Sequence, residues 1–186
     1  MTVKNFDELK QVAPRCMSPF VAVPAVPVPT EDAGDDGDLG DLGGDACLTG
    51  FELTCTCGHT SHVVQGYYLK HADTGELLFY GPISLKCTGC GKLSLLFDIA
   101  KHGYDAECGH EVYEQRGAGT PQPFECEGCG KTAFAVLCEL EYPDDLFDPE
   151  IADLKGRAPE LFTMVTVVGK CDACGEEAHI YASECA

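Results

Sequence analysis

The sequence has no tryptophan and few basic residues: 12 lysines and arginines stand against 31 aspartates and glutamates among 186 residues, for a formal net charge of −19. Binding to a nucleic-acid backbone or to an anionic membrane surface needs clustered Lys and Arg. The scarcity of basic residues therefore argues against both as the main partner. A protein partner with a basic surface fits this charge better, because opposite net charges speed encounter. Solubility alone is the other explanation of the acidity.

Long apolar segments are also missing. No run approaches the roughly 20 residues of a transmembrane helix. The N-terminal residues show no positive stretch followed by an uninterrupted apolar core, which a secretory signal would have. The apolar segment at 20–28 is broken by Pro24 and Pro27. We therefore expect a cytoplasmic protein with no membrane segment.

Cysteine, in contrast, is abundant, with 13 residues in the chain. In a reducing compartment this number indicates metal binding rather than disulfide bonds. Because the count is odd, at least one cysteine has a different role from the others.

Residues 1–46 form the N-terminal segment of the expected organisation. A short helix is predicted around residues 6–12. A proline-punctuated stretch that begins at residue 17 should be extended. The stretch at 31–45 contains seven acidic residues and no basic one, so it cannot bury enough apolar area to order itself. We expect a disordered acidic linker there.

From residue 50 onward, short runs of β-type composition alternate with Cys–Gly turns. The predicted strands are 51–55, 63–70, 77–86, 93–98, 124–125, 132–142, 161–170 and 178–183, with one helical turn near 151–155. A first unit at 47–100 and a second at 124–186, joined by a crossover at 101–123, follow the same order of strands and turns. We interpret this as a duplication of architecture, with chance similarity of two β-rich halves as the alternative.

Four turns that contain paired cysteines are the candidate metal-binding motifs of the sequence. Two cysteines separated by two residues direct both sulfurs at one ion, and the glycine that follows accepts a positive φ and turns the chain back. Zinc takes four soft ligands in a tetrahedron, so two such turns are needed for each ion and four turns make two closed sites. The turns are Cys55-Thr-Cys57-Gly58, Cys87-Thr-Gly-Cys90-Gly91, Cys126-Glu-Gly-Cys129-Gly130 and Cys171-Asp-Ala-Cys174-Gly175.

The turns at 87–91, 126–130 and 171–175, each placed between predicted strands, resemble those of zinc ribbons and rubredoxin-like metal-binding modules. The resemblance covers most of residues 51–185 and identifies a type of fold, not a function. It implies a mainly β chain with two tandem zinc-ribbon-like antiparallel units after the disordered acidic segment, and two structural Zn²⁺ ions. The natural pairing within each half assigns one ion to Cys55, Cys57, Cys87 and Cys90, and the other to Cys126, Cys129, Cys171 and Cys174.

The first turn departs from this pattern, because a single residue separates Cys55 from Cys57. The shorter spacing makes a two-sulfur chelate harder to form. His59 and His62 follow closely, and either one is an alternative ligand in place of a sulfur. Iron is an alternative to zinc as the metal.

A binding module is the function that these features favour, and one version is an acidic immunity- or antitoxin-like protein that neutralises a basic toxin. An accessory zinc ribbon of the nucleic-acid machinery is the alternative. A zinc-dependent or thiol enzyme is less favoured, because glycine and strands rather than a helix follow the cysteine pairs. Cys108 and His110, which lie beside Tyr104 and Asp105, form the only cluster of nucleophile-, base- and acid-type residues, and an incidental thiol in a polar loop is the alternative. We expect no enzymatic activity.

Overall fold

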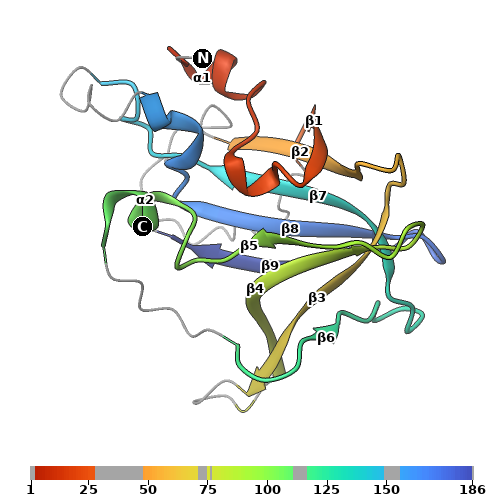
Figure 1. Cartoon of the computed structure of the whole chain (residues 1–186). Helices are drawn as coiled ribbons and strands as arrows, with labels where there is room; N and C mark the ends of the chain where they lie inside the picture. The colour runs from red at the N-terminus through yellow and green to blue at the C-terminus, as the bar shows by residue number, and fades with distance from the viewer. Residues whose placement is uncertain are drawn as a thin grey trace, which may run out of the picture.

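The computed structural model is mainly β (Figure 1) and describes residues 3–27, 48–70, 75, 77–110, 117–148 and 156–185. Its helical elements are α1 (Phe6–Leu9), the 3-10 turn η1 (Arg15–Met17) and α2 (Tyr104–Cys108), and residues 156–160 form a further 3-10 stretch. Its strands are β1 (Phe20–Ala25), β2 (Leu48–Cys55), β3 (Ser61–Lys70), β4 (Leu77–Cys87), β5 (Leu93–Phe97), β6 (Gln122–Pro123), β7 (Ala133–Glu141), β8 (Met164–Cys171) and β9 (Glu177–Glu184). Among the described residues, no helix is long and apolar enough to cross a membrane.

The described strands form one antiparallel sheet built around β3 and β7. One edge of β7 pairs with β8, which in turn pairs with β9. The other edge of β7 pairs with β3 at residues 133–135 and with β2 at residues 136–141. Strand β3 repeats this arrangement: β4 lies on one edge, and β7 and β6 lie on the other. The two halves therefore share a single sheet.

A local twofold pseudosymmetry relates the two halves, and its axis passes through the pair formed by His62 and Phe134. Both residues stand four positions after the glycine of a cysteine turn, and they are partners across β3 and β7. On either side of this pair, Ser61 faces Ala135 and Val63 faces Ala133, which is the reciprocal arrangement that a twofold axis produces. The strand register at this point is therefore equivalent in the two halves.

The two halves are not separate tandem units, because the first strand of each half pairs with a strand of the other half. Strand β2 of the first half pairs with β7 of the second, whereas β6 of the second half pairs with β3 of the first. The main-chain N–H of Phe124, just after β6, donates to the carbonyl of Val64 at 2.9 Å and extends that pairing. If each half paired its first strand internally, the two halves would form separate sheets with more unpaired strand edges, which are a liability for a small sheet. Pairing across the halves removes these edges.

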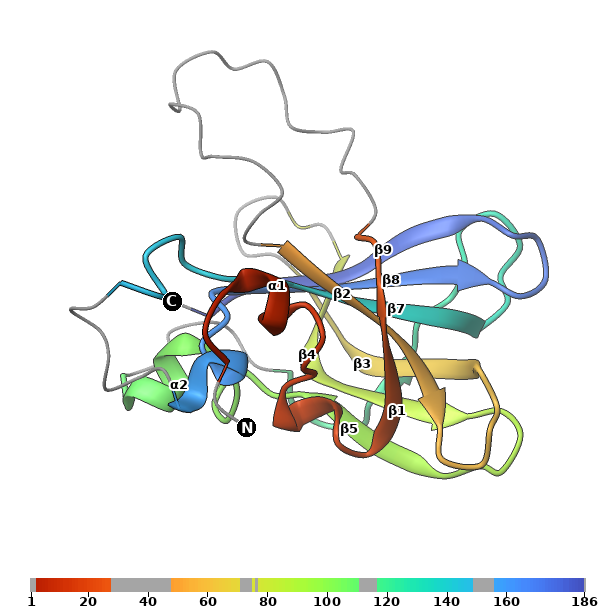
Figure 2. The same cartoon turned by 90° about the horizontal axis from the view of Figure 1, so that it is seen from above.

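The N-terminal segment belongs to the sheet and the core (Figure 2). The extended stretch expected as a linker forms β1, which runs antiparallel to β2 with Phe20 opposite Cys55. Pro24 is tolerated because β1 is an edge strand, where a missing N–H breaks no ladder. Helix α1 appears where a helix was predicted. The acidic stretch at 31–45 and the predicted turn at 151–155 lie outside the described residues.

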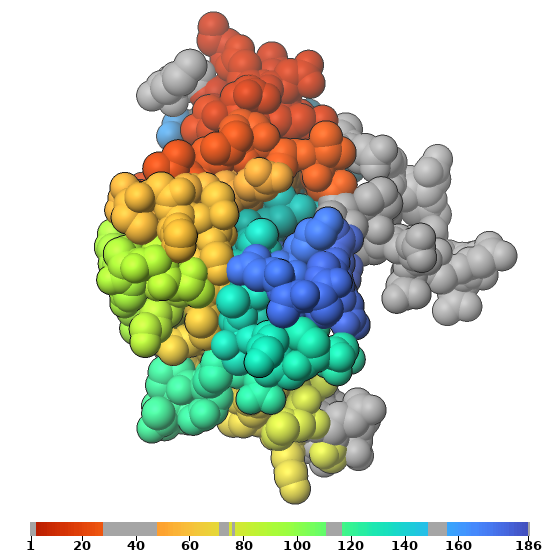
Figure 3. All heavy atoms as spheres, turned by 90° about the vertical axis from the view of Figure 1, so that its right-hand side faces the viewer, coloured from red at the N-terminus to blue at the C-terminus, as the bar shows by residue number. Residues whose placement is uncertain are grey.

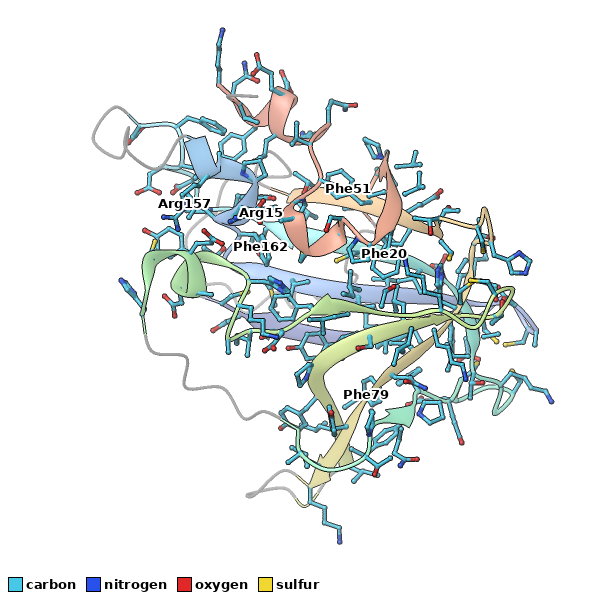
Figure 4. The ribbon with its side chains drawn as sticks, in the orientation of Figure 1. Arg15, Phe20, Phe51, Phe79, Arg157 and Phe162 are labelled. Atoms are coloured by element: carbon cyan, nitrogen blue, oxygen red, sulfur yellow. The ribbon has the colours of Figure 1, made fainter. Side chains whose placement is uncertain are left out.

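The core lies between the layers of the curved sheet and is rich in aromatic rings. Phe51 and Phe162 are fully buried, and Figure 4 shows both in the interior. Cys138 on β7 also lies in the core and is 1% exposed. The hydroxyl of the buried Tyr142 donates to the carbonyl of Pro159 at 3.0 Å, so this ring satisfies its polar end inside the core.

The end of the molecule that carries α2 is held by ion pairs and lies opposite the cysteine turns (Figure 2). The carboxylate of Glu107 is 2.7 Å from Arg15 and 2.9 Å from Arg157. Figure 4 labels both arginines at this end. The core and this charged cluster thus leave the cysteine turns at a separate, accessible end.

Candidate metal centres

The eight predicted ligand cysteines lie in two clusters of four, and the sulfur atoms of each cluster are within 4.8 Å of one another. One cluster joins the β2–β3 turn to the β4–β5 turn, and the other joins the β6–β7 turn to the β8–β9 turn. The first holds Cys55, Cys57, Cys87 and Cys90, and the second holds Cys126, Cys129, Cys171 and Cys174. The pairing within each half is therefore the one predicted from the sequence.

The sulfur–sulfur distances match a tetrahedral site. In the first cluster, Cys55 Sγ is 3.7 Å from Cys90 Sγ, and Cys57 Sγ is 3.6 Å from Cys87 Sγ. A tetrahedron with metal–sulfur bonds of about 2.3 Å has edges of about 3.8 Å. A disulfide would bring the sulfurs to about 2.05 Å. The cluster therefore has the spacing of a four-thiolate metal site and not that of two disulfides.

The second cluster repeats this geometry and the same cross-pairing. Cys126 Sγ is 3.6 Å from Cys174 Sγ, and Cys129 Sγ is 3.5 Å from Cys171 Sγ. In both clusters, the first cysteine of one turn faces the second cysteine of the opposite turn. The first cysteine of each turn is buried and the second is exposed. Each site is thus anchored in the core on one side and reaches the surface on the other.

Backbone hydrogen bonds hold each turn in the shape that brings its sulfurs together. At the turn that follows β4, the N–H of Gly91 donates to the carbonyl of Cys87, and the N–H of Cys87 donates to the carbonyl of Lys92, both at 2.9 Å. The turns that begin at Cys126 and Cys171 have the same two bonds. The four turn glycines have φ between 66° and 90°, as predicted.

The short first turn has the same two hydrogen bonds, but each partner lies one residue closer in sequence than in the other turns. The N–H of Gly58 donates to the carbonyl of Cys55, and the N–H of Cys55 donates to the carbonyl of His59, both at 2.8 Å. Losing one residue between the cysteines therefore shortens the loop without removing either hydrogen bond. This explains how Cys57 still reaches the cluster.

Neither histidine joins the ligand atoms in the described part of the chain. His62 is fully buried on β3, with its ring 6.0 Å from that of Phe20 in an edge-on arrangement. Burial lowers its pKa below the usual histidine value. The ring of His59 lies over Gly89, where it fills the space that a Cβ would need. The structure thus favours four cysteines over a mixed set at the first cluster.

The backbone of the turns lowers the pKa of three cluster thiols. The largest cause for Cys55 is a hydrogen bond from the backbone of Cys57, and its pKa falls to about 7. Hydrogen bonds from the backbone of Cys174 and its neighbour lower the pKa of Cys171 to about 7. Turns that point N–H groups at sulfur stabilise its ionised form, which is the form that binds metal. For Cys126 burial is the largest cause, and its pKa is raised instead.

The two clusters differ in the side chain that covers them. Glu176 Oε2 lies 3.7 Å from Cys126 Sγ and 4.0 Å from Cys174 Sγ, over Gly128. His59 takes the corresponding position over Gly89 in the first cluster. Both residues directly follow a turn glycine, but no local sequence pattern indicates that their side chains cover the opposite turn. The second cluster thus has a carboxylate beside its sulfurs, and the first has an imidazole.

The other polar cluster considered from the sequence lies on α2 and just beyond it. His110 Nδ1 is 3.2 Å from Asp105 Oδ1. The half-buried Cys108 is packed against the hydroxyl of Tyr104 instead, whose pKa is raised by burial first and by Cys108 second. The hydrogen bonds and ion pairs of the described residues do not join Cys108 to His110. This arrangement does not form a nucleophile–base pair.

Comparisons with protein-family models, with curated proteins and with solved structures find no match.

Proposed function

We propose that the chain is a zinc-stabilised protein-interaction module whose two metal ions are structural. The observation that carries this proposal is the closure of both clusters: four sulfurs surround each site at tetrahedral separations. A catalytic zinc site usually has three protein ligands and keeps one position open for water or substrate. Four cysteines leave no such position, which supports cohesion rather than catalysis.

A set of four cysteine thiolates is better suited to zinc than to harder cations such as magnesium and calcium. Thiolates are soft ligands that select zinc, copper(I) or iron–sulfur chemistry, whereas magnesium and calcium take oxygen ligands. A bound Zn²⁺ supplies folding free energy by holding the two turns of a cluster together. The two turns of each cluster lie at the same end of the sheet, so each ion would tie neighbouring strand ends together.

The proposed partner is a protein with a basic surface. The formal net charge is −19, and eight ionised thiolates with two dications would take it to −23. Several basic side chains are already paired with neighbouring carboxylates: Arg15 with Glu107 and Glu160, Arg157 with Glu107, and Lys101 with Asp98. Neutralisation of a phosphate backbone needs cations that are free to contact it. This charge balance supports a basic protein over a nucleic acid, and an antitoxin-like protein with a basic toxin is one case of such a pair.

Native mass spectrometry of the chain isolated from its own cells tests this proposal. The expected result is a complex that contains two zinc ions and a protein of high isoelectric point. Raising salt from about 0.05 M to about 0.5 M should dissociate the partner, because a shorter screening length weakens attraction between exposed charges. A chain without zinc, an acidic partner or a salt-independent complex would contradict the proposal.

A further inference from the structure

A groove of about 350 Å³ crosses the outer face of the sheet over β7. Figure 3 shows β7, in teal, between β2, in orange, and the β8–β9 hairpin, in blue. The groove lies on the sheet face opposite the core and ends near the cysteine turns, with Thr60 in its lining. It is therefore a surface that the metal-bound fold presents to solvent.

The floor of the groove is apolar. Leu137 lies in the middle of β7, with Glu52 of β2 on one side and Val168 of β8 on the other. Ala135, two residues earlier on the same face, is exposed and continues the floor toward the cysteine turns. These side chains make a shallow apolar channel across three strands.

The rim is acidic. Glu52 and Glu177 are exposed on opposite sides of the groove. Lys170 also lines it, but its Nζ lies 4.0 Å from Glu177, so its charge is largely offset. Among the described residues, Glu52 has no ion pair. The groove thus combines apolar contact area with unbalanced negative charge.

Apolar surface continues from the groove along β1. Val21 and Val23 are about half exposed, at 51% and 49%, and Val23 is the register partner of Glu52. The free edge of β1 is a poor place for a partner strand to add, because Pro24 has no N–H to offer. A partner would therefore be recognised by side chains on this face and not by backbone pairing at the free edge of β1.

We propose that this groove binds an extended segment of the partner protein in which apolar side chains alternate with Lys or Arg. The inference rests on the proposed function, because it locates where that partner binds. The volume is at the lower end of ligand pockets, which span about 300–1,000 Å³, and it accommodates a few side chains rather than a folded domain. Apolar side chains fill the floor, and a basic one meets Glu52, the rim carboxylate that has no ion pair among the described residues. The net charge of −19 disfavours an acidic segment at this surface.

Panning a phage-displayed library of random nonapeptides against the zinc-loaded chain tests the groove. The enriched peptides should alternate Val, Ile or Leu with Lys or Arg. Resynthesised peptides should bind Glu52→Lys at least about tenfold more weakly, because a basic residue then faces a lysine. The control is Glu184→Lys, which makes the same change of charge at an exposed position at the end of β9, outside the groove, and it should retain most of the affinity.

A second variant, Leu137→Gln, tests the floor without changing the net charge. It should also weaken binding at least about tenfold, with the zinc content and melting temperature measured to show that the variant is folded. Failure to enrich any peptide, enrichment of acidic peptides, or equal weakening by Glu52→Lys and Glu184→Lys would overturn the groove proposal. So would a groove occupied by a second copy of the chain. If the chain still carries two zinc ions and binds a basic partner in any of these cases, the proposed function stands and only its location is wrong.

Discussion

The hydroxyl of Ser61 donates a hydrogen bond to the carboxylate of Asp172, which directly follows a cysteine of the second cluster. The carbonyl of Ser61 accepts hydrogen bonds at 3.1 Å from both the N–H and the hydroxyl of Thr88, which follows a cysteine of the first cluster. At the pseudosymmetric position, the carbonyl of Ala133 accepts from the N–H of Asp172 at 3.0 Å. Alanine has no hydroxyl to complete the arrangement, so of these two positions only Ser61 joins one turn of each cluster.

Removing this hydroxyl should loosen the link between the clusters. We expect Ser61→Ala to lower the free energy of unfolding of the zinc-loaded chain by about 1–2 kcal/mol, less than the largest values for hydrogen bonds to charged groups because this bond is exposed to solvent. Asp172→Asn, which keeps an acceptor, should cost less. Urea denaturation measures both, with Ser94→Ala on β5 as the matched control. Equal losses for Ser61→Ala and Ser94→Ala would show that the link contributes nothing.

The left-handed backbone at the turn glycines gives a second prediction. Gly130 has a φ of 66°, and a Cβ built there meets nothing within 4 Å. Gly130→Ala should therefore destabilise the chain by backbone strain alone, by about 1–2 kcal/mol. Gly156 is equally open but lacks a positive φ, so Gly156→Ala should be close to neutral. Thermal melting of the two zinc-loaded variants compares them, and similar melting temperatures would refute the strain argument.

The pH dependence of stability should contain a contribution from His102. Burial lowers its pKa below about 6.5, the unfolded value, and its Nδ1 accepts a hydrogen bond from the N–H of Asp98 at 3.1 Å. Between the folded and unfolded pKa values the unfolded chain binds more protons, so stability rises with pH in that window and is lost as pH falls below about 6.5. His102→Asn keeps an acceptor but does not titrate there.

Urea denaturation near pH 7.5 and near pH 5.8 measures this contribution. Wild type should lose more stability than His102→Asn on acidification, whereas His179→Gln, at an exposed position on β9, should follow wild type. The difference between variants separates His102 from the protonation of the cysteines, which all three proteins share. Identical slopes for wild type and His102→Asn would exclude a role for this histidine.

The sequence predicts the chemistry of the cysteine turns better than it predicts their surroundings. Ligand spacing and the glycine after each pair are local features, so the four turns, their positive φ values and the division into two clusters could be predicted. Strand β1 could not, because Pro24 and Pro27 are typical of an extended linker, and only the edge position of β1 makes Pro24 acceptable.

The pairing of each half's first strand with the other half could not be predicted from the sequence either, for a different reason. A β-type pattern identifies a strand and its buried face, but it does not identify the partner of that strand. Leu53 pairs with Val136 of the other half, and neither residue differs from an ordinary core residue in the sequence. The bond between Ser61 and Asp172 depends in turn on this long-range arrangement, so no local pattern indicates it.

Counting zinc ions by native mass spectrometry tests the central claim, that two four-sulfur clusters each hold a structural ion, most directly. Wild type should carry two ions, and Cys129→Ser should carry one and melt at a lower temperature, because a lost ligand removes metal-derived folding free energy. Cys108→Ser, which alters a thiol outside both clusters, should retain two. A wild-type chain with no metal, or a folded Cys129→Ser variant that still holds two ions, would contradict the account.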